Sequence, residues 1–391
     1  MKNCGNKKNR ITGLFLILIV FAGMLLLTAC SGKEKKEAKS ESVDKLKLSY
    51  ATQFEVSTFE GGYRLIHIED GMDYVLIPEG QPDSDLGIGE AVLIHEPLDS
   101  IYLAASSAMD FFVRLDSLDR IKACSTSASD YSIEEAVKRI EAGEIKYVGK
   151  YSSPDYETLL NSGCDLAIES TMITHSPKIR EELEDLGIPV LTERSSYEKD
   201  PLGRLEWIKL YGVLLGKEKE AEEYFSAEEK KAIAVEESLK NESRNEEDKK
   251  KVAFFYLSSN GYVNVRKPGD YVSEMIEMAG GTYAFKNIAD ESDNALSTMN
   301  INWEEFYKDA VDADILIYNA TIDGGIEKVS ELVDKNPLFE DFKAVKLRNV
   351  YCSNADMFQR TSLVADIITD MYKVINSGET DNLQFMYKVG N

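Results

Sequence analysis

Residues 146–191 read KYVGKYSSPDYETLLNSGCDLAIESTMITHSPKIREELEDLGIPVL, in which short apolar runs alternate with longer amphipathic segments. Short apolar runs bounded by glycine, proline or polar residues are typical of strands in a parallel sheet that is covered on both faces. The longer segments between them have apolar residues at helical spacing. The alternation therefore predicts a parallel α/β unit. We expect strands at 146–149, 165–168 and 189–191, and helices at 155–161 and 178–186.

The same alternation continues outward in both directions. An apolar strand at 100–105 precedes the quoted stretch, and a second series begins at 252–257 (VAFFYL) and ends with a helix at 361–375. A length of 391 residues is also more than one ordinary domain needs. We therefore predict an α/β fold with two Rossmann-like lobes built on parallel sheets, over residues 100–200 and 250–391.

A faint internal repeat supports two lobes of one plan. Residues 156–160 (YETLL) and residues 303–307 (WEEFY) each precede an aspartate and an apolar run. Each copy begins with an aromatic residue followed by a glutamate, Glu157 in the first and Glu304 in the second. Two similar lobes leave a ligand cleft between them.

Residues 201–240 interrupt the alternation and predict one long helix between the lobes. Pro201 suits the first position of a helix, and apolar residues from Leu205 to Leu215 recur at helical spacing. The second half is dense in Glu and Lys, which is typical of a solvated helix face.

Residues 46–99 have a different pattern from both lobes. Polar and apolar residues alternate through 47–80, with glycine-containing turns at 60–62 and 69–71. This pattern predicts two or three antiparallel strands, and therefore a small N-terminal antiparallel β region.

The N-terminal segment has the order of a secretion signal. Basic residues from Lys2 to Arg10 precede an uncharged run at 11–27, and Leu27-Thr28-Ala29-Cys30 follows. This looks like a bacterial lipobox, in which residues 1–29 are removed and Cys30 is lipidated. We expect a lipid anchor at Cys30, a flexible tether over 30–45 and a place on the extracytoplasmic face of the cell membrane. The alternative is an ordinary membrane anchor in which the cysteine is incidental.

Charge and composition exclude several functional classes. The formal net charge is −24, and loss of the four cations before residue 30 would lower it to −28. So acidic a chain is a poor ligand for nucleic acid. The three histidines and five cysteines form no CxxC or HExxH motif, and there is neither a G-x-S-x-G nor a phosphate-binding loop. We expect no catalysis, no metal site and no cofactor, and we expect Cys124, Cys164 and Cys352 to be buried thiols.

Five segments resemble the periplasmic-binding-protein family that serves iron-siderophore, haem and cobalamin ABC importers. The resemblance spans about 100–375, in the family's order and spacing. The chain departs from the family at the residue before Asp165 in the first lobe and before Asp314 in the second. These residues are Cys164 and Ala313, where the family usually has proline. The segments are 149–168, 187–191, 202–225 with its Gly216-Lys217…Ala221 ending, 270–285 and 344–351.

The resemblance implies a monomeric receptor that captures an iron complex, with a ferric siderophore as first candidate, and delivers it to an ABC permease and its ATPase. Cobalamin and haem are alternative ligands for the same class of transport protein. A surface receptor that signals without transport is an alternative from a different functional class. An enzyme on a similar fold would need a tightly bound cofactor. The family also implies that Glu157 and Glu304 dock on permease arginines, with Glu305 as the substitute for Glu304. Alternatively, each glutamate only stabilises the first turn of its helix.

The ligand is expected at the loops that follow the strands, because ligands of open α/β sheets bind outside the carboxyl ends of the strands. These segments are rich in Tyr, Met, Arg and hydroxyl groups, which suit a large, flat ligand with some anionic character. The arginines could instead pair with surface acids, and the histidine could be structural. The candidate ligand-binding residues are Ser107, Met109, Tyr151, His175, Arg194, Tyr262, Arg266, Met357 and Gln359.

Overall fold

The computed structural model describes residues 42–241, 245, 248–289, 297–378 and 380–390. The expected signal peptide, Cys30 and most of the tether lie outside the described residues. Within the described ranges, no helix is long and apolar enough to cross a membrane.

The N-terminal β region is a five-stranded sheet in the order β1-β2-β3-β4-β5. The first four strands pair antiparallel, where two or three antiparallel strands were predicted, and β5 adds a parallel edge to β4. Phe54 lies on one face of this sheet and packs on Trp207, with ring centroids 5.0 Å apart. The sheet therefore shares a core with the connecting helices. The strands are β1 Asp44–Lys45, β2 Phe54–Thr58, β3 Arg64–Ile68, β4 Met72–Ile77 and β5 Val92–His95.

The first lobe has a five-stranded, fully parallel sheet in the order β10-β9-β6-β7-β8, which confirms the α/β prediction. Sequence reasoning missed β7, because its short IKAC run has an exposed lysine in the middle. The strands are β6 Ile101–Leu103, β7 Ile121–Cys124, β8 Lys146–Tyr147, β9 Leu166–Ser170 and β10 Val190–Glu193. The helices are α2 Met109–Arg114, α3 Glu134–Glu141, α4 Tyr156–Asn161 and α5 Pro177–Asp185.

The connection between the lobes is helical, but it is not the single helix expected over 201–240. It comprises α6 Pro201–Glu206, α7 Ile208–Leu215 and α8 Glu218–Asn241. The chain turns at Gly216, whose φ is +65°, and the Lys217 amide donates to the Gly212 carbonyl over 2.7 Å. Gly212 also lets α7 approach α8, because a Cβ there would lie 2.7 Å from that of Ala221. The break is therefore fixed by two glycines.

The second lobe has a seven-stranded sheet in the order β14-β12-β11-β15-β16-β17, with β13 beside β11. Strands β13, β11, β15 and β16 pair parallel, whereas β12 pairs antiparallel with both β11 and β14, and β17 pairs antiparallel with β16. The expected parallel sheet is thus extended into a mixed one. The strands are β11 Lys251–Leu257, β12 Val263–Arg266, β13 Thr282–Tyr283, β14 Thr298–Ile301, β15 Ile315–Tyr318, β16 Val350–Ser353 and β17 Met386–Lys388.

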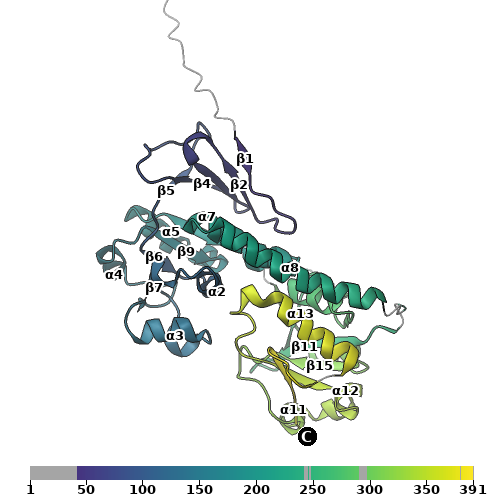
Figure 1. Ribbon diagram of the computed structural model, residues 1–391. Helices are drawn as coiled ribbons and strands as arrows, with labels where there is room; N and C mark the ends of the chain where they lie inside the picture. The colour runs from purple at the N-terminus through teal and green to yellow at the C-terminus, as the bar shows by residue number, and fades with distance from the viewer. Residues whose placement is uncertain (1–41, 242–244, 246–247, 290–296, 379, 391) are drawn as a thin grey trace, which may run out of the picture. The chain divides into compact units, whose positions relative to one another are not determined.

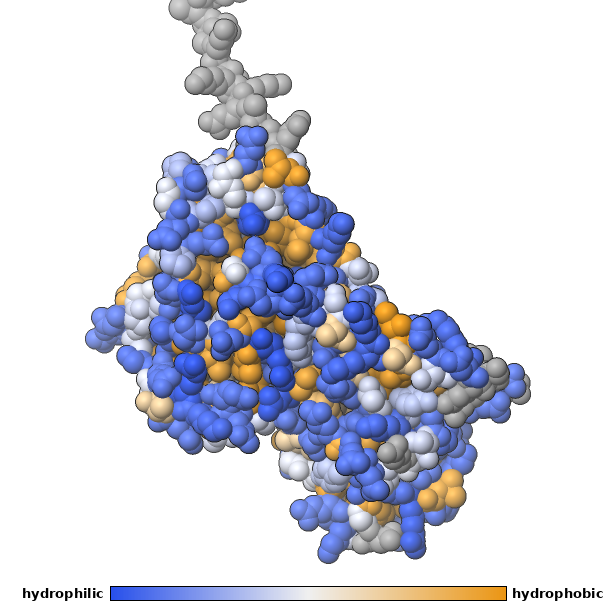
Figure 2. Space-filling view, in the orientation of Figure 1, coloured by the Kyte–Doolittle hydropathy of each residue, from blue (hydrophilic) through white to orange (hydrophobic). Residues whose placement is uncertain are grey.

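Helices cover the second sheet, and one of them joins the connection. Helix α13 packs along α8 (Figure 1). An aromatic cluster of Trp303, Phe306, Phe339 and Phe342 closes the other end of the lobe. The face of the molecule in Figure 2 is mostly hydrophilic, as the net charge requires. The helices are α9 Tyr271–Met278, α10 Trp303–Ala310, α11 Val329–Lys335, α12 Lys343–Lys346 and α13 Val364–Tyr372.

Candidate functional site

The carboxyl-terminal edges of the two lobe sheets meet. The side chain of Gln359, after β16, accepts from the Ser132 amide over 2.8 Å and donates to the Asp130 carbonyl over 2.7 Å. The Thr361 hydroxyl donates to the Ser107 carbonyl over 3.0 Å. We call the segments that follow these strand ends the strand-end loops. They are residues 104–107, 125–133, 148–155, 171–176 and 194–200 in the first lobe, and 258–262, 319–325 and 354–362 in the second.

A buried carboxylate strengthens this contact. Asp110 on α2 is fully buried and accepts from both the amide and the hydroxyl of Ser362 in the other lobe. Arg360 and Arg114 lie 3.8 and 3.9 Å from the same carboxylate. Sequence reasoning missed Asp110, although a lone aspartate inside the apolar run AMDFFV was a signal for it. We call these bonds, with those of Gln359 and Thr361, the lobe contact.

The predicted ligand residues fall into two groups by exposure. Tyr262 is 48% exposed and His175 is exposed, whereas Ser107, Tyr151 and Gln359 are half-buried. Tyr151 packs against the apolar layer on one face of the first sheet. These five side chains lie on the strand-end loops of both lobes.

The other predicted ligand residues are buried or occupied. Met109 and Met357 are in the core. Arg266 lies on β12 rather than on a strand-end loop, and its guanidinium makes bonds of 2.6 and 2.8 Å to Asp270. Arg194 donates to the Gln53 side chain over 3.1 Å and stacks on the Tyr197 ring at 4.5 Å.

Glu157 and Glu304 occupy equivalent places in the fold. Each is the second residue of its helix, α4 or α10, and both side chains are exposed. The helix starts are also equivalent, because Asp155 and Asn302 each cap the third amide with a side-chain oxygen. The structure thus reproduces the sequence repeat as two matching helix starts, one in each lobe.

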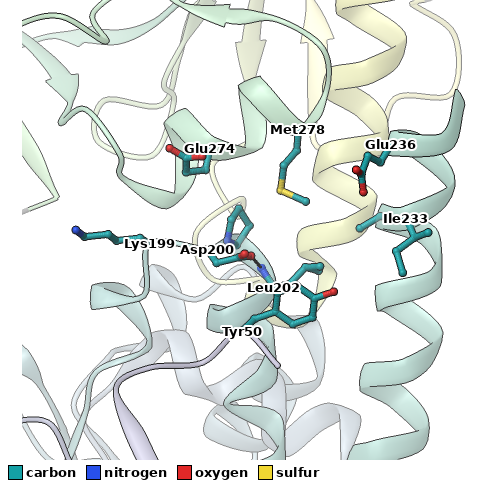
Figure 3. Close-up of a pocket in the computed structure, with 10 residues that line it drawn as sticks. Tyr50, Lys199, Asp200, Leu202, Ile233, Glu236, Glu274 and Met278 are labelled. Atoms are coloured by element: carbon teal, nitrogen blue, oxygen red, sulfur yellow. Dashed lines mark hydrogen bonds between the residues drawn. The ribbon is translucent and has the colours of Figure 1, made fainter. Parts of the chain in front are cut away.

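One of the cavities found among the described residues lies beside the connection and away from the predicted ligand residues. It has a volume of about 410 Å³. Figure 3 shows Met278 of α9 pointing toward Tyr50 and Leu202, with Ile233 and Glu236 of α8 at one side and Lys199 pointing away. A much smaller space of about 10 Å³ lies beside Arg360 and Thr361, between the connection and the second lobe.

The cavity beside the connection is acidic as well as apolar. Asp200 and Glu274 line it, and their pKa values are raised, first by burial and also by neighbouring carboxylates. We assign it no ligand, because every predicted ligand residue lies elsewhere.

Two buried carboxylates hold the segment 49–53, which we call the strap, onto the connection. Glu206 accepts from the amides of Ser49, Tyr50 and Ala51 over 2.8–3.0 Å. It also accepts from Lys209 over 3.0 Å.

Glu198 holds the other end of the strap. It accepts from the amides of Thr52 and Gln53 and from the Trp207 indole, each over 2.9 Å. Gly203 lets the strap pass, because a Cβ there would lie 2.9 Å from the Tyr50 carbonyl oxygen. Nothing in the sequence signalled this arrangement.

Glu169 on β9 is a buried carboxyl that lacks the hydrogen-bond donors that Glu206 and Glu198 have. It is fully buried, and neither of its oxygens has a hydrogen-bond partner among the described residues. Burial raises the pKa of Glu169 to about 8, although the nearby Arg180 lowers it in part. The neighbouring Tyr102 hydroxyl has no partner in this part of the chain either. Glu169 is therefore protonated at neutral pH.

No group of His, Cys, Asp or Glu in the described ranges is arranged to hold a metal ion. Cys124 and Cys352 are buried and Cys164 is half-buried, each as a free thiol. Burial raises the pKa of Cys124 to about 11 and that of Cys164 to about 12. These thiols stay protonated and unreactive at neutral pH.

A family model described as periplasmic binding protein matches residues 103–356, which includes most of both lobes and the whole connection. The chain belongs to the periplasmic binding protein family. The connecting helices and most strands of the lobe sheets fall inside the match, whereas the N-terminal sheet and the strap precede it and α13 and β17 follow it.

Two relatives of this binding protein are uncharacterized lipoproteins of Methanocaldococcus jannaschii. One is 30% identical over 246 residues, which is 61% of this chain and 54% of the relative. The chain thus spans about half the length of that relative. The other is 25% identical over 407 residues and covers 96% of this chain and 99% of the relative.

Solved structures share the fold at low identity. A periplasmic binding protein from Veillonella parvula has a TM-score of 0.60 at 15% identity, over 83% of this chain and 98% of that one. A periplasmic haem-binding protein from Pseudomonas aeruginosa has a TM-score of 0.56 at 15% identity, over 75% of this chain and 98% of that one. An ABC-type Fe3+-hydroxamate transport system from Saccharomonospora viridis has a TM-score of 0.52 at 18% identity, over 72% of this chain and 94% of that one. These likenesses support the two-lobe fold.

Proposed function

We propose that this binding protein is a lipid-anchored receptor that captures an iron complex, with a ferric siderophore as first candidate, and delivers it to an ABC importer. The observation that carries the proposal is the meeting of the carboxyl-terminal edges of two α/β sheets at the lobe contact. Open α/β sheets bind ligands at this edge. The names of two structural neighbours, a periplasmic haem-binding protein and an Fe3+-hydroxamate transport system, favour an iron complex as the ligand.

The ligand is proposed to bind after the lobe contact separates, since Gln359, Thr361 and Ser362 bridge the loops of the two lobes. The bonds at this contact are few, and Gln359 and Arg360 are partly exposed. The ligand would then touch Ser107, Tyr151, His175 and Tyr262. Met109, Met357 and Arg266 support these loops from the core, and Arg194 orders the loop after β10.

Delivery is proposed to use Glu157 and Glu304. Both are exposed at matching helix starts, one in each lobe, so a single partner could contact both. Anchoring through Cys30 would keep the receptor beside its permease and ATPase at the membrane surface.

The test measures binding and uptake separately. Full-length receptor should bind an iron(III) siderophore, and cells that carry it should take the iron up. A Glu157→Ala, Glu304→Ala double variant should abolish uptake and leave affinity unchanged. The Glu181→Ala variant is a matched control, because Glu181 is also exposed on a first-lobe helix. A loss of affinity in the double variant would contradict the docking role.

Haem is the second candidate, and the exposure of His175 favours it. An exposed imidazole on the loop after β9 could coordinate haem iron. Addition of haemin should then give a Soret band that shifts in wild-type protein and not in a His175→Ala variant. If the two spectra coincide, His175 is not a haem ligand.

A further inference from the structure

The arginines nearest the strand-end loops are all engaged by the protein itself. Arg266 is 6% exposed and makes two short bonds to Asp270. Arg360 lies 3.8 Å from Asp110 and 3.5 Å from Asp356. Arg194 is held by Gln53 and Tyr197. Buried Arg204 stacks on the Tyr271 ring at 4.3 Å. Each guanidinium therefore already has partners.

The same loops expose large apolar side chains. Met172 follows β9 and is 41% exposed, Tyr262 follows β11 and is 48% exposed, and Ile322 follows β15 and is 64% exposed. All three lie at the carboxyl-terminal edge of a lobe sheet, where the ligand is proposed to bind. The loops thus offer three large apolar or aromatic side chains to a ligand, beside exposed polar residues such as Asn260 and Asp323.

We propose that the cleft selects an iron chelate of little or no negative charge, of the iron(III) tris-hydroxamate kind, over an anionic tris-catecholate or haem. Met172, Tyr262 and Ile322 provide the contact surface. The proposal rests on the proposed function and narrows its substrate class.

The physical reason is the cost of leaving charges without partners. An anionic chelate that enters the cleft loses water, and it needs guanidinium or ammonium groups in exchange. Arg266 and Arg360 could turn to it only by leaving Asp270 and Asp110, which are buried. A buried carboxylate without its partner is strongly destabilising. A neutral chelate requires no such exchange, and its apolar flanks bury the exposed side chains.

Lys150 and Lys199 are cations on these loops that could still serve an anion. Lys150 is exposed on the loop after β8 and Lys199 on the loop after β10, and none of the ion pairs found among the described residues includes either one. If the ligand is neutral, Lys150 contributes little, and a Lys150→Gln variant keeps its affinity.

The first experiment titrates the full chain in detergent with three probes. They are iron(III)–desferrioxamine, an iron(III) tris-catecholate and haemin, and tryptophan fluorescence reports binding. The proposal predicts that the hydroxamate binds at least about tenfold more tightly than either anion, a difference of about 1.4 kcal/mol. Equal or tighter binding of an anion overturns this proposal and leaves the proposed function standing. If none of the three probes binds, the proposed function itself fails.

The second experiment uses variants of the same chain. Tyr262→Ala should weaken hydroxamate binding by about tenfold, because an aromatic contact is lost. Leu347→Ala is the matched control, since Leu347 is 56% exposed but precedes β16 at the opposite edge of the sheet. Ile322→Lys should improve catecholate binding. Unchanged hydroxamate affinity in Tyr262→Ala, or a loss in Lys150→Gln, would contradict the proposal.

Discussion

Two polar junctions hold the lobes and the N-terminal sheet together, and they differ in how completely they are buried. At the strap, Glu206 is fully buried, and its carboxylate accepts hydrogen bonds of 2.8–3.0 Å from three amides and from the Lys209 ammonium group. At the lobe contact, Asp110 is also fully buried and accepts from Ser362, but its other oxygen has no hydrogen-bond partner among the described residues. Gln359 is only half-buried there, and Arg360 reaches Asp110 at 3.8 Å. Buried, fully bonded carboxylates are costly to disturb, whereas exposed pairs contribute little. We therefore expect the lobe contact to open before the strap does.

The largest effect is expected at the strap. Glu206→Ala removes the acceptor of three strap amides and the buried partner of Lys209, so the free energy of unfolding should fall by about 3–5 kcal/mol. Urea denaturation followed by circular dichroism measures the change. Glu222→Gln is the control, because Glu222 lies 2.9 Å from the same Lys209 but is 58% exposed. Equal losses in the two variants would mean that the strap junction is no stronger than a surface ion pair.

Glu169 sharpens the comparison, because it is a buried carboxyl without the donors that Glu206 has. Its pKa of about 8 lies far above that of an unfolded chain, so the neutral form favours the folded state. The contribution of Glu169 to the free energy of unfolding is fully present below the pKa that this carboxyl has in the unfolded chain. The contribution falls as the pH rises toward 8 and is constant above it. The Glu169→Gln variant should not show this loss. Its free energy of unfolding should exceed that of the wild type by on the order of 3 kcal/mol at pH 8 and differ little at pH 4.

Denaturation curves across this pH range measure the difference between wild type and the Glu169→Gln variant. Glu181→Gln serves as the exposed control and should follow the wild type. A gain in Glu169→Gln that is the same at every pH would show that ionisation of Glu169 is not the cause.

The smallest effect is expected at the lobe contact. Gln359→Leu removes two bonds between the lobes, and the free energy of unfolding should fall by less than about 1.5 kcal/mol. Amide hydrogen exchange at 130–132 should nevertheless quicken clearly, since local opening requires only this contact. Gln81→Leu, on an exposed loop, should change neither quantity. A stability loss as large as that of Glu206→Ala would break the comparison.

Sequence patterns predicted the elements that bury apolar surface in a regular way. The two lobes, the N-terminal antiparallel strands and the matching places of Glu157 and Glu304 followed from periodicity and a repeat. The connection was predicted as one helix, because Gly212 and Gly216 have no effect on hydrophobic spacing. Their effect appears only when α7 packs against α8.

The contacts of individual side chains could not be read from the sequence. Ser49 lies 157 residues from Glu206, and no local pattern links a strap amide to a carboxylate so far along the chain. Arg266 was expected to face a ligand, yet its partner Asp270 lies four residues away and satisfies it. The sequence shows which groups carry charge, but the fold decides which of them are already paired.

Hydrogen exchange of the full chain with and without iron(III)–desferrioxamine tests the central claim most directly. Capture between the lobes predicts slower exchange at 171–176, 258–262 and 319–325, with the strap unchanged. Slower exchange confined to the cavity around Tyr50, Leu202 and Met278, or no change at the strand-end loops when the probe is bound, would contradict the account.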